Sequence, residues 1–465
     1  MKTQTILITG GIVVNDSGMG YADLLIENEK VKAQALPGTF KDLHVDVSID
    51  ATDKFVLPGL IDPHVHFNSP FMGSKTIHDY DNGTIAAAFG GITTIIDFST
   101  QPKGGSLLEN LNQKEEEAHG KAYIDWSMHG IILDTDPKAL AEIPQLIDKG
   151  VPTYKCFTTY RHADRMTDDQ GMLRILETTA RYGGMLMVHC EDDAIIEYHL
   201  NQELAAKHYD SIYHARSRPA SAENEAIKRV IALMRECTAP VYIVHTSTAE
   251  SVDIIEEARQ AGLPIHSETC THYLALTEEA LKLENGYYFI CSPPLRTQRD
   301  IDYLWRAAAD GRIEVVSSDD AGMPSQERIK LGKGRFDKIT NGMPGIEPRL
   351  SIMFTEGYGK GKISLPRLVA LTSTNPAKLF GMYPDKGNLF PGADADLVIY
   401  NPKGKWTMRA SNLHMNDDFC PFEGWKINGH VETVISRGQF VIKNGELVGK
   451  PGHGKRVIRK LLDAV

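Results

Sequence analysis

The chain has 465 residues, a length that predicts about three domains or one large barrel with a smaller partner. Fifty Lys and Arg against 61 Asp and Glu give a net charge of −11, which argues against a nucleic-acid-binding surface because such surfaces are basic. Hydrophobic residues make up 42% and charged residues 24%, proportions that are typical of globular proteins and exclude extensive disorder.

The two ends of the chain carry similar β-type patterns. Residues 1–55 contain the short apolar runs TILITGGIVV, DLLIENEKV and VSIDATDKFVLPG, bounded by Gly, Asn and Asp. The same pattern of short apolar runs occurs near the other end, in ADLVIYNP and ETVISRGQFVIKNGELVG. We therefore expect one small β-sandwich domain built from both termini, from residues 1–55 and 385–450, followed by a C-terminal tail at 451–465.

The middle of the chain, residues 56–384, follows a different pattern. Eight apolar, β-branched runs each end in a polar or ionisable cluster, and helix-like segments lie between most of them. In chain order the runs are GLIDPHVHF, TTIIDFST, YIDWSMHGII, PTYKCFTTY, GMLMVHCED, VYIVHTST, LPIHSETCTHY and RIEVVSSDDAG. Eight such units predict an α/β fold with a TIM-like (β/α)₈ barrel, whose chemistry lies at the C-terminal ends of the strands. A longer insertion, about residues 194–240, separates units five and six.

Several of these strand ends carry side chains of the types that commonly bind metal ions. His64 and His66 stand at i and i+2 on the first strand, so both imidazoles point the same way. His189, His245 and Asp319 follow the fifth, sixth and eighth runs. Each histidine alone is more often a structural residue, but four histidines and an aspartate at one barrel mouth predict a site for Zn²⁺ or a related divalent ion.

Lys155 is unusual because it stands among apolar neighbours in the fourth strand, PTYKCFTTY. A buried ammonium group is costly unless it is paired. One interpretation is an ion pair with a nearby carboxylate. The other is a neutral amine that adds CO₂ and becomes a carbamate, an anionic ligand able to bridge two metal ions. The residues alone leave both interpretations open.

The cysteines indicate the cellular compartment. None of the six forms a C-x-x-C pair, and most stand inside apolar runs, which favours reduced, buried thiols over disulfides. The N-terminus lacks the long apolar core of a signal peptide, and no stretch reaches the length of a membrane helix. We therefore expect a cytoplasmic protein with no membrane partner. The cysteines are Cys156, Cys190, Cys237, Cys270, Cys291 and Cys420.

From about Leu57 to Gly424 the chain resembles the cyclic amidohydrolases, most closely the dihydropyrimidinase and D-hydantoinase group. The order and spacing of ten segments carry the resemblance. They are PGLIDPHVHF, AAAFGGITTIIDF, YKCFTTYR, MVHCED, IVHTST, ETCTHYL, CSPPLR, NGMPGIEPRL, TSTNPAKLFGMYPDKG and PGADADLVIYNP.

The resemblance implies two divalent metal ions, expected to be Zn²⁺, and a CO₂-derived carbamate. By position, the metal ligands are His64 and His66 for the first ion, Lys155 as the carboxylated bridge, His189 and His245 for the second ion, and Asp319. Asp319 is also implied as the group that shuttles a proton.

Three further positions match substrate-binding residues of that group. Tyr160 matches a tyrosine whose hydroxyl polarises the scissile carbonyl, and Ser292 and Asn341 match residues whose backbone groups hold the ring amide. For Ser292 and Asn341, a role as turn residues beside Pro293 and Gly342 is an alternative. The implied activity is ring opening of 5,6-dihydropyrimidines or 5-substituted hydantoins to N-carbamoyl amino acids, by a homotetramer.

The chain departs from the family pattern at some positions. Asp320 stands where the family has His, RHAD follows Tyr160 in place of Lys-Gly or Lys-Asn, and FNSP after His66 also differs. Alternatives are an allantoinase or a dihydroorotase, whose cationic groups for a substrate carboxylate could be confused with Arg161 or Arg165. A third alternative is a non-catalytic interaction protein of the same fold. The presence of all six implied ligands argues against it.

Overall fold

Eight parallel strands form a barrel in which each strand pairs with the next in the chain. The structure is a computed structural model that describes residues 4–332 and 334–461. The barrel strands are β8 (Leu60–Val65), β11 (Ile92–Thr100), β12 (Asp125–Ile131), β13 (Thr153–Phe157), β14 (Met185–His189), β15 (Val241–Ile243), β16 (Ile265–Cys270) and β17 (Val315–Ser317). They fall in the eight apolar runs, so the predicted barrel is confirmed.

The barrel closes where the last strand meets the first. A parallel bridge joins Val65, the last residue of β8, to Asp320, which lies just beyond β17. The backbone N–H of His66 donates to the carbonyl oxygen of Asp320 at 2.8 Å. Every residue of β8, β12, β13 and β14 is buried, as expected for parallel strands that are covered on both faces.

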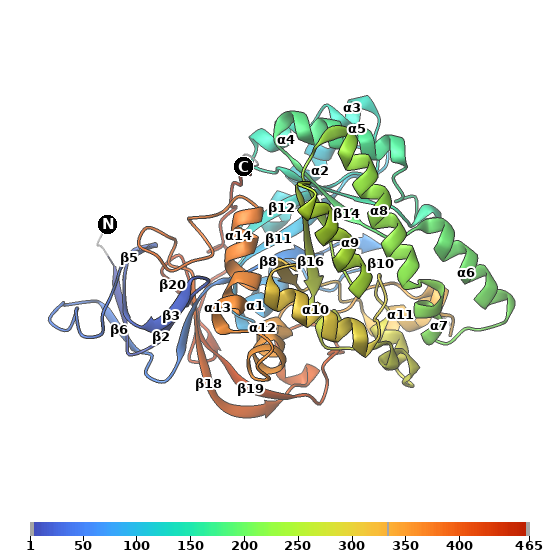
Figure 1. Cartoon of the computed structure of the whole chain (residues 1–465). Coiled ribbons are helices and arrows are strands. Elements are labelled where there is room, and N and C mark those ends of the chain that lie inside the picture. Colours follow the sequence, from blue (N-terminus) through green and yellow to red (C-terminus); the bar gives the residue numbers. More distant parts are fainter. Residues whose placement is uncertain (1–3, 333, 462–465) are drawn as a thin grey trace.

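Helices surround the barrel (Figure 1). They are α1 (Asn82–Phe89), α2 (Leu107–Ala118), α3 (Pro137–Leu140), α4 (Ile143–Asp148), α5 (Asp169–Tyr182), α6 (Asp193–Ala205), α7 (Ile212–Ser217), α8 (Ala220–Cys237), α9 (Ala249–Gln260), α10 (Gln298–Asp310), α11 (Ser325–Gly332), α12 (Pro348–Ile352), α13 (Leu365–Val369) and α14 (Asn375–Leu379). Helices α1 to α10 occupy the connections between the barrel strands, and α11 to α14 follow the last strand. Helices α6, α7 and α8 form the long insertion between β14 and β15.

Short helical turns fill several loops. They are η1 (Arg161–Ala163), η2 (Thr271–Leu274), η3 (Glu278–Lys282), η4 (Gly286–Phe289), η5 (Phe336–Lys338), η6 (Met353–Tyr358), η7 (Ala370–Thr374) and η8 (Ala410–Asn412). Of these, η6 and η7 are π-helical turns.

Helix α5 shows why the sequence forms these helices where it does. The Asp168 side chain accepts the Gly171 N–H at 2.7 Å and caps the first turn. Gly183 ends the helix at φ +76°, a conformation that glycine adopts without strain. The buried residues Met172, Ile175 and Thr179 recur at helical spacing, so one face of α5 packs on the barrel.

The two ends of the chain build two sheets beside the barrel (Figure 1). The four-stranded sheet contains β5 (Lys30–Ala35), β4 (Asp23–Glu27), β1 (Thr5–Thr9) and β6 (Val47–Asp50). The seven-stranded sheet contains β21 (Glu446–Leu447), β20 (Gln439–Lys443), β19 (Lys426–Ser436), β18 (Leu397–Thr407), β7 (Phe55–Pro58), β2 (Ile12–Asn15) and β3 (Gly18–Tyr21).

A single hydrophobic core, with Ile6 and Leu24 from one sheet and Leu397 and Ile435 from the other, joins the two sheets. This confirms the expected β-sandwich built from both termini. The division into residues 1–55, 56–384, 385–450 and 451–465 remains a prediction. In the structure β7 belongs to the seven-stranded sheet and β8 to the barrel, so the chain passes from one to the other at Gly59.

The C-terminal tail lies along the barrel in an extended conformation. Arg456 bridges to Trp126, beside the start of β12. The buried Arg459 side chain donates to Ser127 Oγ and Thr153 Oγ1, both at 2.9 Å. These buried contacts hold residues 455–461 against the barrel, and this segment contains no helix. Residues 462–465 lie outside the described part of the chain.

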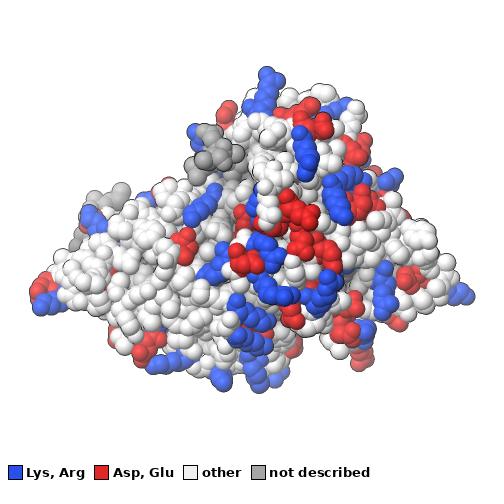
Figure 2. Space-filling model, in the orientation of Figure 1, with Lys and Arg blue, Asp and Glu red and all other residues white. Residues whose placement is uncertain are grey.

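The surface in Figure 2 carries interspersed acidic and basic side chains, with no extended basic patch on the face shown. Among the described residues, no helix is long and apolar enough to cross a membrane. All six cysteines are free, as expected. Cys156 and Cys190 are buried in the main hydrophobic core.

Candidate active site

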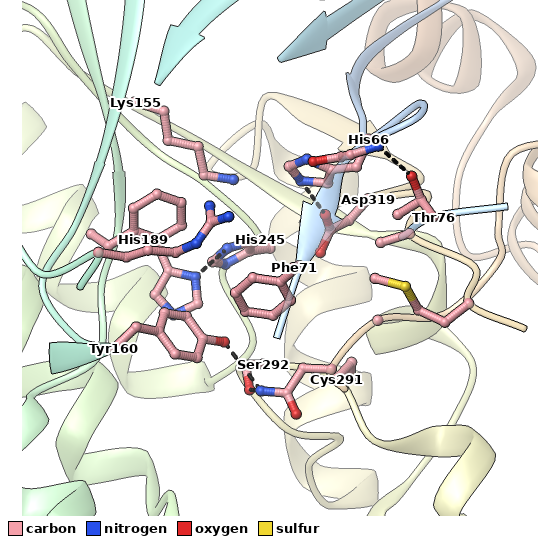
Figure 3. Close-up of a pocket in the computed structure, with 17 residues that line it drawn as sticks. His66, Phe71, Thr76, Lys155, Tyr160, His189, His245, Cys291, Ser292 and Asp319 are labelled. Atoms are coloured by element: carbon pink, nitrogen blue, oxygen red, sulfur yellow. Dashed lines mark hydrogen bonds and ion pairs between the residues drawn. The ribbon is translucent and has the colours of Figure 1, made fainter. Parts of the chain in front are cut away.

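The structure brings the predicted site residues together at the C-terminal end of the barrel strands (Figure 3). Eight of the nine line one pocket with an empty volume of about 590 Å³, and His64, which is fully buried, is the ninth. The eight are His66, Lys155, Tyr160, His189, His245, Ser292, Asp319 and Asn341.

One candidate ligand group combines the first and the last barrel strand. The Nε2 atoms of His64 and His66 lie 3.1 and 3.4 Å from Asp319 Oδ1. These three ligand atoms lie within 4.8 Å of one another, so one cation could contact all three. Burial would raise the pKa of Asp319, but His64, His66 and His245 lower it well below its usual value, so the residue is a carboxylate.

A buried carboxylate fixes the orientation of the His64 ring. Glu268, on β16, makes a short hydrogen bond with His64 Nδ1 and accepts the Tyr242 hydroxyl at 3.1 Å. With Nδ1 occupied by Glu268, the Nε2 atom of His64 is left facing Asp319. Carboxylates of this kind orient histidine ligands in metal sites and raise their basicity.

A second histidine pair lies across the pocket from His66 (Figure 3). His189 Nδ1 and His245 Nε2 are 2.9 Å apart, and His189 Nε2 is 2.8 Å from Glu191 Oε2. Glu191 in turn pairs with Arg218 at 2.5 Å. Burial lowers the pKa of both histidines, so each ring is neutral and keeps the lone pair that a metal needs.

Lys155 projects from β13 towards the same space (Figure 3). Its Nζ lies 2.8 Å from His64 Nε2 and 4.5 Å from the centre of the Phe98 ring. No described carboxylate forms an ion pair with Nζ, although Asp319 and Glu268 lie close enough to raise its pKa, and the carbamate remains a prediction. Burial lowers its pKa to about 8, so a substantial fraction of the amine is neutral near physiological pH.

The backbone is strained at three of the predicted residues. Tyr160, His245 and Asp319 have φ values of +68°, +42° and +47°, in the left-handed region that non-glycine residues rarely adopt. Such residues persist only where the surrounding structure enforces them, and they cluster at functional sites. The strain therefore marks the places where the chain leaves a regular element to direct a side chain into the pocket.

The three predicted substrate-binding residues form one hydrogen-bonded group. Asn341 Nδ2 donates to Ser292 Oγ at 2.8 Å and to the Tyr160 hydroxyl oxygen at 3.2 Å (Figure 3). Burial raises the pKa of Tyr160, so its hydroxyl stays protonated and can donate to a ligand. All three side chains line the pocket.

Asp320, which departs from the family pattern, does not line the pocket. Its Oδ1 accepts the backbone N–H groups of Gly345 and Ile346 at 2.8 and 3.1 Å, and its Oδ2 lies 2.6 Å from His78 Nδ1. The other ring nitrogen of His78 lies 3.2 Å from Asp417. Asp320 therefore belongs to a buried ion-pair network behind the metal-ligand candidates.

Sequence reasoning missed the partners that orient the candidate ligands. Glu268 and Glu191 stand in the quoted segments ETCTHYL and MVHCED, so an acidic residue at a buried strand position was an available signal. His78 and Asp417 had no such signal, because no local pattern connects residues so far apart. The pocket is also lined by Phe71 and Arg165, from loops that differ from the family pattern.

Comparison with known proteins identifies the relatives of this site. Residues 55–441 match the model of the amidohydrolase family. The chain is 41% identical to a D-hydantoinase from Geobacillus stearothermophilus over 98% of this chain and 97% of that one. It is 38% identical to a D-hydantoinase from Streptomyces coelicolor, with the same coverage.

A solved structure of a similar protein has the same fold. The crystal structure of dihydropyrimidinase from Brevibacillus agri superposes with a TM-score of 0.96 at 40% identity, over 99% of this chain and all of that one. The family model covers most of the chain, and the similarity extends over nearly its full length. The chain belongs to the amidohydrolase family.

Proposed function

We propose that this protein hydrolyses a cyclic amide in a metal-dependent reaction that opens 5,6-dihydropyrimidines or 5-substituted hydantoins to N-carbamoyl amino acids. The convergence of six nitrogen and oxygen ligand side chains at one end of the barrel carries the proposal. The relatives named D-hydantoinase and dihydropyrimidinase favour this activity over that of an allantoinase or a dihydroorotase. The complete ligand set argues against a non-catalytic protein.

The donor set fits two divalent ions, which we propose to be Zn²⁺. Neutral imidazoles, a carboxylate and a lysine with a lowered pKa are the forms that binding and carbamate formation require. When bound, the ions would supply Lewis acidity and activate a water near neutral pH. The residues that would hold them are His64, His66, Lys155 as its carbamate, His189, His245 and Asp319.

The chain's own residues would position the ring and move the protons. Asp319, a carboxylate at the pocket, would accept the proton of the attacking water and return it to the leaving amide nitrogen. The protonated Tyr160 hydroxyl would donate to the oxyanion that develops on the scissile carbonyl. Ser292 and Asn341 would hold the ring amide beside Tyr160.

The proposal also covers the oligomeric state and the cellular compartment. The resemblance to the hydantoinase group supports a homotetramer, and the free, mostly buried cysteines support a reducing compartment such as the cytoplasm. Size measurement of the purified protein by light scattering tests the first point.

Lys155→Ala tests the proposal most simply, because it removes the amine that would form the carbamate. We expect loss of ring opening for hydantoin and dihydrouracil together with loss of bound metal. Added acetate or propionate would restore part of both, since a small carboxylate can occupy the space and replace the bridging oxygens. Lys121→Ala, at an exposed lysine, is the control and should keep full activity and metal content.

Full activity with full metal occupancy in Lys155→Ala would overturn the assignment. Allantoin and dihydroorotate belong in the same substrate panel. Faster hydrolysis of allantoin than of hydantoin and dihydrouracil would replace the proposed substrate class, and so would a rate for dihydroorotate above that for every 5-substituted hydantoin.

A further inference from the structure

One arginine among the pocket-lining residues is not among the proposed metal ligands. Arg165 follows η1 and lines the pocket with Phe71 and Phe157. Its guanidinium carbon lies 4.8 Å from the centre of the Phe71 ring and 5.9 Å from that of Phe157. An Nη atom donates to the carbonyl oxygen of Pro70 at 3.0 Å. These contacts hold the guanidinium at the pocket wall.

Two other arginines near the site are already neutralised. Arg161, four residues earlier in the same loop, pairs with Asp193 at 3.0 Å and does not line this pocket. Arg218 pairs with Glu191 at 2.5 Å. Among the described residues, no carboxylate forms an ion pair with Arg165. Its charge is therefore left without an acidic partner inside the protein.

The other charged groups of the pocket are accounted for by the proposed metal centre. Asp319 and Lys155 are the remaining Asp, Glu, Lys or Arg side chains among the residues that line it, and both are assigned as ligands. Arg165 thus contributes a positive charge that neither the protein nor the metal centre offsets. A guanidinium has five N–H donors in a planar fork, and Pro70 uses one of them.

We propose that Arg165 binds a carboxylate on the exocyclic substituent of the substrate, so that the preferred substrates are cyclic amides with an acidic side chain. The inference rests on the proposed function and specifies its substrate class. The fork of guanidinium N–H groups matches the two oxygens of a carboxylate, and partial exclusion of water in the pocket strengthens the interaction. Phe71 and Phe157 would contact the apolar part of the substituent.

Pairs of substrates that differ only in charge provide the test. We would measure kcat/KM of the zinc-loaded enzyme for 5-carboxymethyl- and 5-carboxyethylhydantoin, for their neutral carboxamides and for unsubstituted hydantoin. We expect at least one acid to be preferred over its amide by about tenfold or more, the usual size of a hydrogen bond to a charged partner.

Arg165→Gln should remove that preference and leave the rate for unsubstituted hydantoin within about threefold, since charge-dependent binding is lost and all the proposed metal ligands are kept. Arg161→Gln, which removes a positive charge from the same loop outside the pocket, is the matched control and should keep the preference. The rate for unsubstituted hydantoin shows that each variant is folded and loaded with metal.

Two outcomes would overturn the inference about Arg165 and leave the proposed function standing. They are equal kcat/KM for acids and amides in the wild-type enzyme, and a preference for acids that survives in Arg165→Gln. Failure of the zinc-loaded wild-type enzyme to open hydantoin and dihydrouracil would instead overturn the proposed function, and the inference with it.

Discussion

Replacing His78 with leucine should destabilise the protein strongly, because its buried ring lies between Asp320 and Asp417. Burial raises the pKa of Asp417 to about 7, so Asp417 is only partly ionised at pH 7, and Asp320 is the nearer partner. The Nδ1 of His78 lies 2.6 Å from Asp320 and its Nε2 lies 3.2 Å from Asp417, and the ring is buried. Burial alone would lower the pKa of His78, but Asp320 and Asp417 raise it to about 9. The charged ring is therefore the normal state at neutral pH.

Two estimates of the magnitude agree. A pKa of about 9, against 6.5 for a free histidine, corresponds to about 3 kcal/mol in favour of the charged form. Removing one partner of a buried ion pair costs about 3–5 kcal/mol, because a charge is left without compensation. We therefore expect His78→Leu to lower the free energy of unfolding by about 3–5 kcal/mol at pH 7.

Urea unfolding of the variant and of a matched control measures this loss. His208 also lies 2.6 Å from a carboxylate, that of Glu203, but it is 41% exposed, so His208→Leu should cost less than about 1 kcal/mol. In the wild type the contribution of charged His78 is complete below pH 6.5 and is lost as the pH rises through 9, so its free energy of unfolding should fall from pH 7 to pH 10. A His78→Leu midpoint no lower than that of His208→Leu would refute the reasoning.

Two further predictions concern the pocket and the thiols. Tyr160→Phe should lower kcat for hydantoin by about 100-fold with unchanged metal content, because one donor to the oxyanion is lost, and a decrease below about threefold would contradict that role. In the native protein at pH 8, Ellman's reagent should react with Cys237 at most, since the other five cysteines are buried and burial raises the pKa of Cys156 to about 12. Six reactive thiols should appear in guanidinium chloride, and rapid reaction of several native thiols would contradict the structure.

The sequence predicted the barrel well because its signal is local. Each barrel strand is an apolar run that ends in a polar cluster, and parallel strands require both features. The β domain was harder to delimit. In the run TILITGGIVV, Gly10 and Gly11 divide the chain into β1 and β2, and the sequence does not show that these strands belong to different sheets. A side chain at Gly11 would lie 2.8 Å from Val56, so the crossing requires glycine there.

The residues of the site also differ in how far the sequence could predict them. The candidate ligands could be predicted because each follows a recognisable strand, whereas the groups that orient them come from distant parts of the chain. Glu268 reaches His64 across 204 positions, and Asp320 reaches His78 across 242. Only the folded barrel brings such residues together. Likewise, Arg161 and Arg165 are equivalent in the sequence, and the structure shows that only Arg165 lines the pocket.

Metal stoichiometry against activity tests the central claim most directly. The protein would be stripped of metal with a chelator and titrated with Zn²⁺ in the presence of bicarbonate, while bound metal and hydantoin ring opening are measured on the same samples. We predict that the metal-free protein is inactive and that activity rises with bound zinc and levels off near two ions per chain. Full ring opening by the metal-free protein would contradict the account.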